Sequence, residues 1–225
     1  MERRHAGSVH VMAIIHAAEL TPSKRDALRA WLPSRPWTSS TDVDILGAYR
    51  FDDPAGAVGI ETFLISTGGR VLQVPLTYRG APWPGSDDAL VTTMEHSVLG
   101  TRWAYDGVAD PVYVTALVTA ILTGGTEAAL VYDYEEYDYE APPEKRAVTT
   151  RVVGTGTPGT PVPALDSVSS IDSDDSTTIT AGATRIDLVR AVDTTRSTAA
   201  GPSLTGIWPG QSEPVVLAWI RPHED

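Results

Sequence analysis

The sequence contains no cysteine and only two lysines, and these shortages exclude cysteine-dependent sites and argue against lysine-dependent phosphate binding. Without cysteine the chain forms no disulfide, no thiolate nucleophile, no iron–sulfur cluster and no cysteine-ligated zinc site. A Walker loop needs a lysine beside Ser or Thr after its glycines, and a protein-kinase-like site needs a lysine on a strand. Lys24 falls early in a predicted helix and Lys145 in a predicted hairpin loop. The sequence therefore argues against ATP-dependent phosphoryl transfer by this chain alone.

Positive charge and long apolar runs are also scarce. Lys and Arg number 17 against 29 Asp and Glu, which gives a net charge of -12. This charge repels phosphate polyanions and anionic lipid, so we expect neither a nucleic-acid nor a membrane partner. No stretch reaches the ~20 consecutive apolar residues of a transmembrane helix. The apolar run Val9–Ala18 is interrupted by His10 and His16 and lacks a cleavage site, which favours a core strand over a signal peptide and predicts a cytoplasmic protein.

Two helices are marked by capping residues. The first is predicted to begin at the N-cap Thr21 and to end before Pro33. The second is predicted to begin at the N-cap Asp110, with Pro111 in its first turn, and to end at Gly124–Gly125. Its apolar residues cover most of its circumference, which indicates a helix buried against a sheet.

Most of the remaining chain reads as strands joined by short links, which predicts mainly antiparallel pairing. We expect one domain over residues 1–225 of the α+β class, with a mainly antiparallel sheet packed on the second helix and the first helix near the N-terminus. The predicted strands are Asp42–Tyr49, Val58–Ser66, Arg70–Tyr78, Leu90–Val98, Thr101–Tyr105, Ala128–Glu140, Ala147–Val153, Arg185–Val192 and Val215–Ile220.

Two long stretches are predicted to be loops. Residues 154–182 are first rich in Gly and Pro and then in Ser, Asp and Thr, which is typical of a flexible, solvated loop. Gly154, Gly156 and Gly159 in this stretch fit G-x-G-x-x-G, but prolines follow where a dinucleotide site needs a helix. Residues 198–210 form the second predicted loop, with Trp208 as its anchor.

The densest group of chemically capable residues is Met94–Pro111. Trp83, in the APWPG loop (81–85), is the aromatic residue that we expect to be most exposed. Neighbouring strand residues point to opposite faces, so the consecutive acid, base and hydroxyl of Glu95, His96 and Ser97 cannot form a triad. One histidine among scattered carboxylates is too little for a metal site, and we assign no catalytic, cofactor or metal residue. The candidate ligand or partner surface comprises Glu95, His96, Arg102, Trp103, Tyr105, Asp106 and Trp83.

Three longer strings resemble a known family. GAYRFDDPAGAVGIETFL (47–64), VLQVPLTYRGAPWPG (71–85) and TMEHSVLGTRWAYDGVADPVYV (93–114) resemble the N-terminal cap domain of actinobacterial maltokinases, and the resemblance extends over roughly residues 11–221 outside 131–184. It implies a cystatin-like fold, a curved antiparallel sheet around a helix. Maltokinases use ATP and Mg²⁺ to make maltose 1-phosphate for α-glucan synthesis, and their catalytic residues lie in the lobes that follow the cap. No position here matches those residues, so the resemblance assigns no catalytic residue and no cofactor.

Three functions remain open. The resemblance implies a non-catalytic, cap-like protein with a binding or regulatory role in α-glucan, trehalose or maltose 1-phosphate metabolism, whose partner is a kinase lobe or a glucan-metabolising enzyme. The second is a glucan-binding module, since aromatic rings stack on sugars. The third is an enzyme centred on Glu95, His96, Arg102 and Asp106, which requires at least two of these to converge in one pocket. The rings available for stacking are Trp37, Trp83, Trp103, Trp208, Tyr49 and Tyr78.

Overall fold

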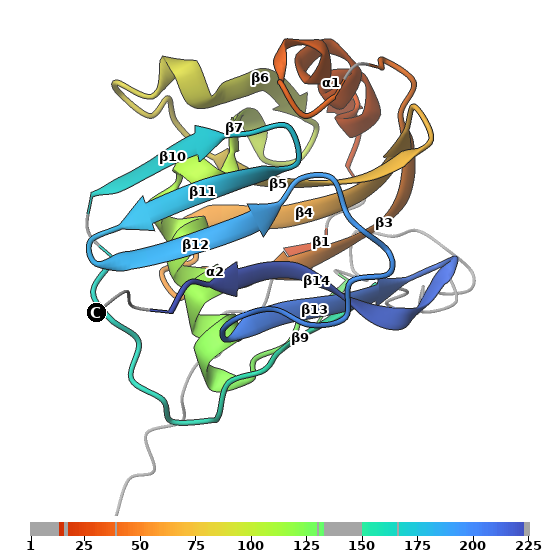
Figure 1. The fold of residues 1–225 in the computed structure, drawn as a ribbon. Coiled ribbons are helices and arrows are strands. Elements are labelled where there is room, and N and C mark those ends of the chain that lie inside the picture. The colour runs from red at the N-terminus through yellow and green to blue at the C-terminus, as the bar shows by residue number, and fades with distance from the viewer. Residues whose placement is uncertain are drawn as a thin grey trace, which may run out of the picture.

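Two six-stranded antiparallel sheets and two helices make up the computed structural model, which describes residues 14–15, 18–38, 40–129, 131–132, 150–165 and 167–222 (Figure 1). The first sheet has the order β2 (Leu20–Thr21), β6 (Leu90–His96), β7 (Gly100–Asp106), β5 (Arg70–Arg79), β4 (Val58–Thr67), β3 (Asp44–Phe51). The second has the order β10 (Val168–Asp172), β11 (Ser176–Ala181), β12 (Thr184–Val189), β14 (Gln211–Ile220), β13 (Ser203–Trp208), β9 (Arg151–Gly154). β1 (Ile14–Ile15) and β8 (Val131–Tyr132) form a short parallel pair. The helices are α1 (Lys24–Trp31) and α2 (Pro111–Thr123), with single 3₁₀ turns at Leu32–Ser34, Asp87–Ala89 and Gly107–Ala109.

The α2 helix begins and ends where its capping residues predict. The Asp110 side chain accepts a hydrogen bond from the backbone N–H of Val112 at 2.9 Å, and Pro111 follows the cap. At the other end Gly124 adopts a left-handed conformation with φ of 69°, which a side chain would strain. Both signals are local, so the sequence alone places this helix correctly.

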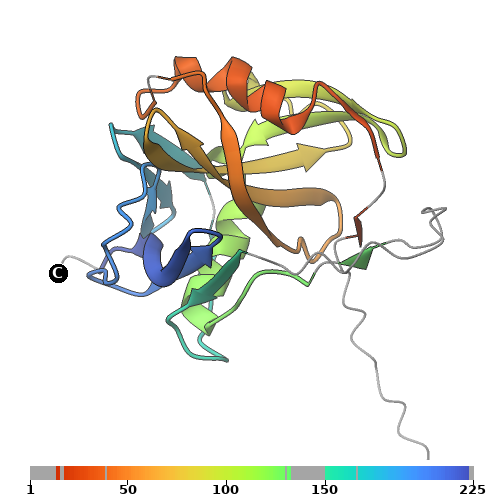
Figure 2. The same cartoon turned by 90° about the vertical axis from the view of Figure 1, so that its right-hand side faces the viewer.

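The first sheet is buried on both faces. Alternate residues of β4 point to opposite sides, so Ile60 and Leu64 join the core around α2, whereas Phe63 and Ile65 join the core under α1. Figure 2 shows α1 lying across this sheet on the side away from α2. A strand covered on both faces has few polar positions, which explains the three consecutive apolar residues Phe63–Ile65 of β4.

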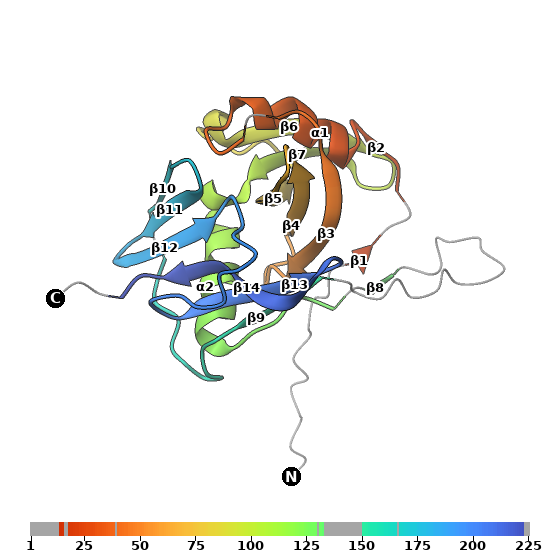
Figure 3. The same ribbon diagram turned by 45° about the vertical axis from the view of Figure 1, so that its right-hand side comes forward.

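The second sheet closes the other side of the α2 core. Leu204 of β13, together with Val215 and Leu217 of β14, packs in the same cluster as α2 (Figure 3). The α+β class and the mainly antiparallel pairing are thus confirmed, but the strands form two sheets instead of the single sheet that the sequence predicts.

The first helix starts later than predicted. Ser23, not Thr21, is its N-cap, and the Ser23 hydroxyl accepts a hydrogen bond from the Asp26 backbone N–H at 3.2 Å. Thr21 instead pairs with Glu95 at the end of β2. The capping signal alone does not distinguish the two hydroxyl residues, because the pairing that engages Thr21 comes from far along the chain.

The predicted loops over 154–182 and 198–210 are wrong where the structure has β10, β11 and β13. In β11 the buried positions alternate, at Thr177, Ile179 and Ala181. Only Ile179 is strongly apolar, so Ser and Thr hide the two-residue period in the sequence. Trp208 is buried, as predicted, but at the end of β13 and not in a loop.

The first two glycines of the G-x-G-x-x-G match, Gly154 and Gly156, lie against the end of α2. The backbone N–H of Gly156 donates to the Ile121 carbonyl at 2.9 Å. A Cβ on Gly154 would lie 1.9 Å from the Ala120 carbonyl oxygen, and one on Gly156 equally close to that of Leu122. Gly154 and Gly156 therefore allow backbone to approach a helix end closely.

The chain leaves and rejoins this part of the fold at neighbouring points. Thr126 bridges Val153 of β9, and the Glu127 carboxylate accepts a hydrogen bond from the Val152 N–H at 2.9 Å. Most of the predicted hairpin of residues 128–140 and 147–153 lies between these two points, outside the described residues. The apolar run 9–18 also lies outside the described residues, apart from residues 14–15 and 18. No helix among the described residues is long and apolar enough to span a bilayer.

Candidate functional site

The β6–β7 hairpin holds Glu95 and His96 at its turn. The Thr101 hydroxyl, directly across from Glu95, donates to the Glu95 carboxylate at 2.9 Å. The His96 Nδ1 accepts the backbone N–H groups of Val98 and Leu99 at 3.3 and 3.1 Å. Both side chains therefore stabilise the hairpin turn.

Arg102 and Asp106 have different surroundings. Arg102 lies across from Met94, one residue out of phase with Glu95, and its Nη1 donates to the Thr101 carbonyl at 3.0 Å. Asp106 is buried at the other end of β7, 2.6 Å from Arg190 of the segment after β12. The four residues of the enzyme hypothesis do not converge in a pocket of the described structure.

Arg190 links the two sheets from a fully buried position. Its Nε donates to the Thr177 hydroxyl of β11 at 2.7 Å, and its guanidinium lies 4.7 Å from the Trp37 ring centroid. Burial raises the pKa of Asp106, and the adjacent guanidinium offsets part of that rise. The pair is structural, and the sequence shows only a charged residue beside an apolar strand.

Three predicted surface residues do come together, around Arg79, which the sequence does not single out. Arg79 donates from Nε and Nη2 to the Asp110 carboxylate at 3.0 and 2.7 Å and lies 4.8 Å from the Trp83 ring centroid. The backbone N–H of Trp83 donates to the Tyr105 hydroxyl at 2.7 Å, and the two rings meet edge to face. Trp103 lies directly across from Arg79. We call Arg79, Trp83, Trp103 and Tyr105 the Arg79 cluster.

Burial separates the six candidate stacking rings. Trp37, Trp208 and Tyr49 are buried and cannot meet a ligand. Tyr78 is half-buried, and its hydroxyl lies 3.3 Å from the Glu61 carboxylate. Trp83 and Trp103 of the Arg79 cluster are also half-buried, so they remain candidates for stacking.

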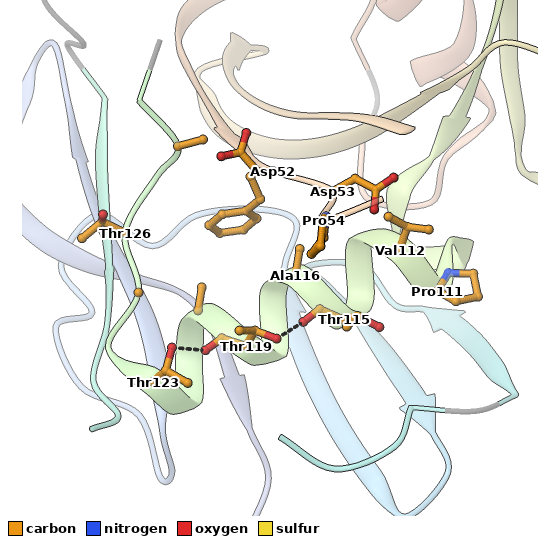
Figure 4. Close-up of a pocket in the computed structure, with 14 residues that line it drawn as sticks. Asp52, Asp53, Pro54, Pro111, Val112, Thr115, Ala116, Thr119, Thr123 and Thr126 are labelled. Carbon is orange, nitrogen blue, oxygen red and sulfur yellow. Dashed lines mark hydrogen bonds between the residues drawn. The ribbon is translucent and has the colours of Figure 1, made fainter. Parts of the chain in front are cut away.

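A groove of about 480 Å³ runs along α2, and none of the seven candidate surface residues lines it (Figure 4). The β3–β4 loop forms one wall, α2 forms the floor, and residues 125–128 form the far end. Arg79 binds Asp110, and the next residue, Pro111, lines the groove, so the Arg79 cluster adjoins its near end. The described residues that line it are Phe51, Asp52, Asp53, Pro54, Pro111, Val112, Thr115, Ala116, Thr119, Ala120, Thr123, Gly125, Thr126 and Ala128.

Hydrogen bonds within the chain fix the floor of the groove, α2, and the wall formed by the β3–β4 loop. The hydroxyls of Thr119 and Thr123 each donate to the carbonyl four residues earlier, at 2.7 Å. The Asp53 carboxylate accepts the backbone N–H groups of Ala55, Ala57 and Val58, which holds the β3–β4 loop. Three distant segments build this groove, so no local motif reveals it.

The described residues contain no group of three or more His, Asp or Glu side chains placed to hold a metal ion.

Comparison with known proteins agrees with the resemblance. Residues 31–110 match the maltokinase N-terminal cap domain. No curated protein matches the chain. The cap-domain match runs from the end of α1 to Asp110, so it contains the whole Arg79 cluster and the β3–β4 wall of the groove. The α2 helix and the second sheet lie beyond it.

Proposed function

We propose that this protein is a non-catalytic binding module of the maltokinase-cap type, which acts in α-glucan metabolism in the cytoplasm through a protein partner. The partner is a sugar-kinase lobe or a glucan-metabolising enzyme. One observation supports this most: the segment that matches the cap domain builds a groove wall and the Arg79 cluster, while the acidic and basic candidates within it stabilise the fold.

A phosphotransfer assay tests the non-catalytic part of this proposal. The purified chain is incubated with ATP, Mg²⁺ and maltose, and sugar phosphate is followed by ³¹P NMR. We expect no product above the rate of a heat-denatured sample. Formation of a maltose phosphate by this chain alone would contradict the proposal.

Binding to kinase lobes tests the partner. A maltokinase from which its own cap has been deleted is mixed with this chain, and the complex is measured by analytical ultracentrifugation. We expect a complex, and a change in the maltose-phosphorylating rate of the lobes. Failure to associate at about 100 µM, where weak complexes are still populated, would remove the kinase lobe as the partner.

Glucan binding is the second candidate, favoured by the half-buried Trp83, whose ring contacts Arg79, and the half-buried Trp103 directly across from Arg79. Titration with maltoheptaose, followed by tryptophan fluorescence, should then show saturable binding that Trp103→Ala weakens about tenfold. Trp219→Ala is the matched control, because Trp219 is also half-buried and has an arginine, Arg196, at 4.2 Å over its ring. Equal losses in both variants would contradict a glucan site at the Arg79 cluster.

A further inference from the structure

The shape of the α2 groove follows from two rows of small residues. Val112, Ala116 and Ala120 recur every fourth residue and form one row, and Thr115, Thr119 and Thr123 form the next. Pro54 of the β3–β4 loop stands over Ala116 in Figure 4. A helix of thirteen residues is about 20 Å long, and lining residues occur from Pro111 to Thr123, so the groove extends along the length of α2. Its volume of about 480 Å³ lies within the range of ligand-binding cavities.

The described lining of this groove accepts hydrogen bonds but hardly donates them. It contains no Lys, Arg, His, Asn, Gln, Tyr or Trp side chain. The hydroxyl protons of Thr119 and Thr123 are directed at helix carbonyls, so among the described lining residues the hydroxyls of Thr115 and Thr126 are the side-chain donors that remain. A ligand must therefore bring most of the donors itself and must also present apolar surface.

The charge of the groove has one sign. Asp52 and Asp53 are its only charged described residues, and Asp52 is exposed. The whole chain adds a net charge of -12. Anionic ligands such as sugar phosphates and nucleotides are repelled, and a cation is attracted.

We propose that the α2 groove docks a basic segment of a partner protein, with Lys or Arg side chains laid along it. The aliphatic stems of such side chains cover the apolar row at Ala116 and Pro54, as long cationic side chains do on apolar surfaces. Their charged ends meet Asp52 and the threonine oxygens. This inference rests on the proposed function, that the chain acts through a protein partner, and adds the chemistry by which the partner is recognised.

A labelled peptide of about ten residues, alternating lysine and leucine, is the probe, and fluorescence anisotropy at about 50 mM salt is the readout. Asp52→Lys reverses a charge in the groove, and Asp87→Lys is its matched control, since Asp87 is exposed in a 3₁₀ turn and does not line the groove. We expect Asp52→Lys to weaken binding about tenfold and Asp87→Lys less than about twofold. Equal losses would mean general attraction to an acidic protein and would overturn the inference.

Ala116→Trp fills the groove without changing charge and should weaken the peptide in the same way, with an unchanged far-UV spectrum as the check of folding. No peptide binding to the unmodified chain at about 1 mM would overturn the inference, and so would maltoheptaose binding that Ala116→Trp abolishes while the peptide still binds. A complex with kinase lobes that survives both groove variants would leave the proposed function standing and overturn the groove as its docking site.

Discussion

At the scale of single residues, Asp110 has two tasks at once. Its carboxylate caps α2 and holds Arg79, and its side chain is fully buried. Asp110→Ala should lower the free energy of unfolding by about 2 kcal/mol, because it removes a helix cap and leaves the half-exposed Arg79 without its partner. Asp110→Asn keeps a capping oxygen and should cost about half as much. Urea denaturation measures both, with Asp87→Ala as a surface control that should change stability by less than about 0.5 kcal/mol.

Glu61 should make stability depend on pH. Burial alone raises the pKa of this carboxyl, but Arg50 and Lys24 together hold it below its ordinary value. Because the folded-state pKa is lowered, the ion pairs stabilise the fold above the unfolded-state pKa, and this stabilisation is lost as the pH falls through the folded-state pKa. Glu61→Gln should therefore be less stable than the unmodified chain at about pH 7, and the difference should shrink toward about pH 3. A difference that stays constant over this range would contradict the role of the charge.

At the scale of elements, local signals decided what the sequence could predict. The two ends of α2 depend on Asp110 and Gly124, which lie within the helix or next to it, and both are correct. The hairpin partners β6 and β7 are also near in sequence. The start of α1 depends on the pairing of Thr21 with the distant Glu95, and there the prediction is wrong. The strands β10 and β11 pair with their neighbours along the chain, but Ser and Thr hide their two-residue period, so they too are predicted wrongly. The site divides between residues that the sequence singles out, Trp83, Trp103 and Tyr105, and features that it does not, Arg79 and the groove, which depend on contacts across the fold.

The β10–β11 hairpin offers a matched pair of isoleucines. Ile179 of β11 is fully buried, and Ile171 of β10 is 76% exposed. Ile179→Ala should lower the free energy of unfolding by about 2–4 kcal/mol through the cavity it leaves, whereas Ile171→Ala should change it by less than about 0.5 kcal/mol. Thermal or urea unfolding distinguishes the two. Equal small effects would mean that residues 168–181 are a solvated loop after all.

At the scale of the whole molecule, Gln73 joins the two sheets. From β5 its side-chain amide donates to the carbonyls of Val189 and Leu217, both at 2.9 Å, and its oxygen accepts the Tyr49 hydroxyl. Gln73→Leu leaves these groups buried without partners and should cost about 2–4 kcal/mol. Gln211→Leu is the control, because Gln211 is half-buried and its side-chain amide donates to the carbonyl of Glu213, two residues away. This change should cost less than about 1 kcal/mol.

The same contacts predict that the family-matched part does not fold alone. In a fragment of residues 18–110, Ile60 and Leu64 would lose the α2 core, and Asp106 would lose Arg190. We expect such a fragment to lack a cooperative thermal transition, whereas the full chain should unfold in one transition by both tryptophan fluorescence and circular dichroism. A cooperative transition in the fragment would show that the first sheet is stable without the second.

The bridge between Thr126 and Val153 also has a practical consequence. Because Thr126 and Val153 already lie side by side, the segment between them can be replaced by a short flexible linker or by an inserted domain at little cost in loop-closure entropy. This junction, closed by the contact of Glu127 with Val152, is therefore a natural place to graft a fluorescent reporter. Since the junction adjoins residues 125–128 of the α2 groove, a reporter there would sense an occupant without touching the helix that binds it.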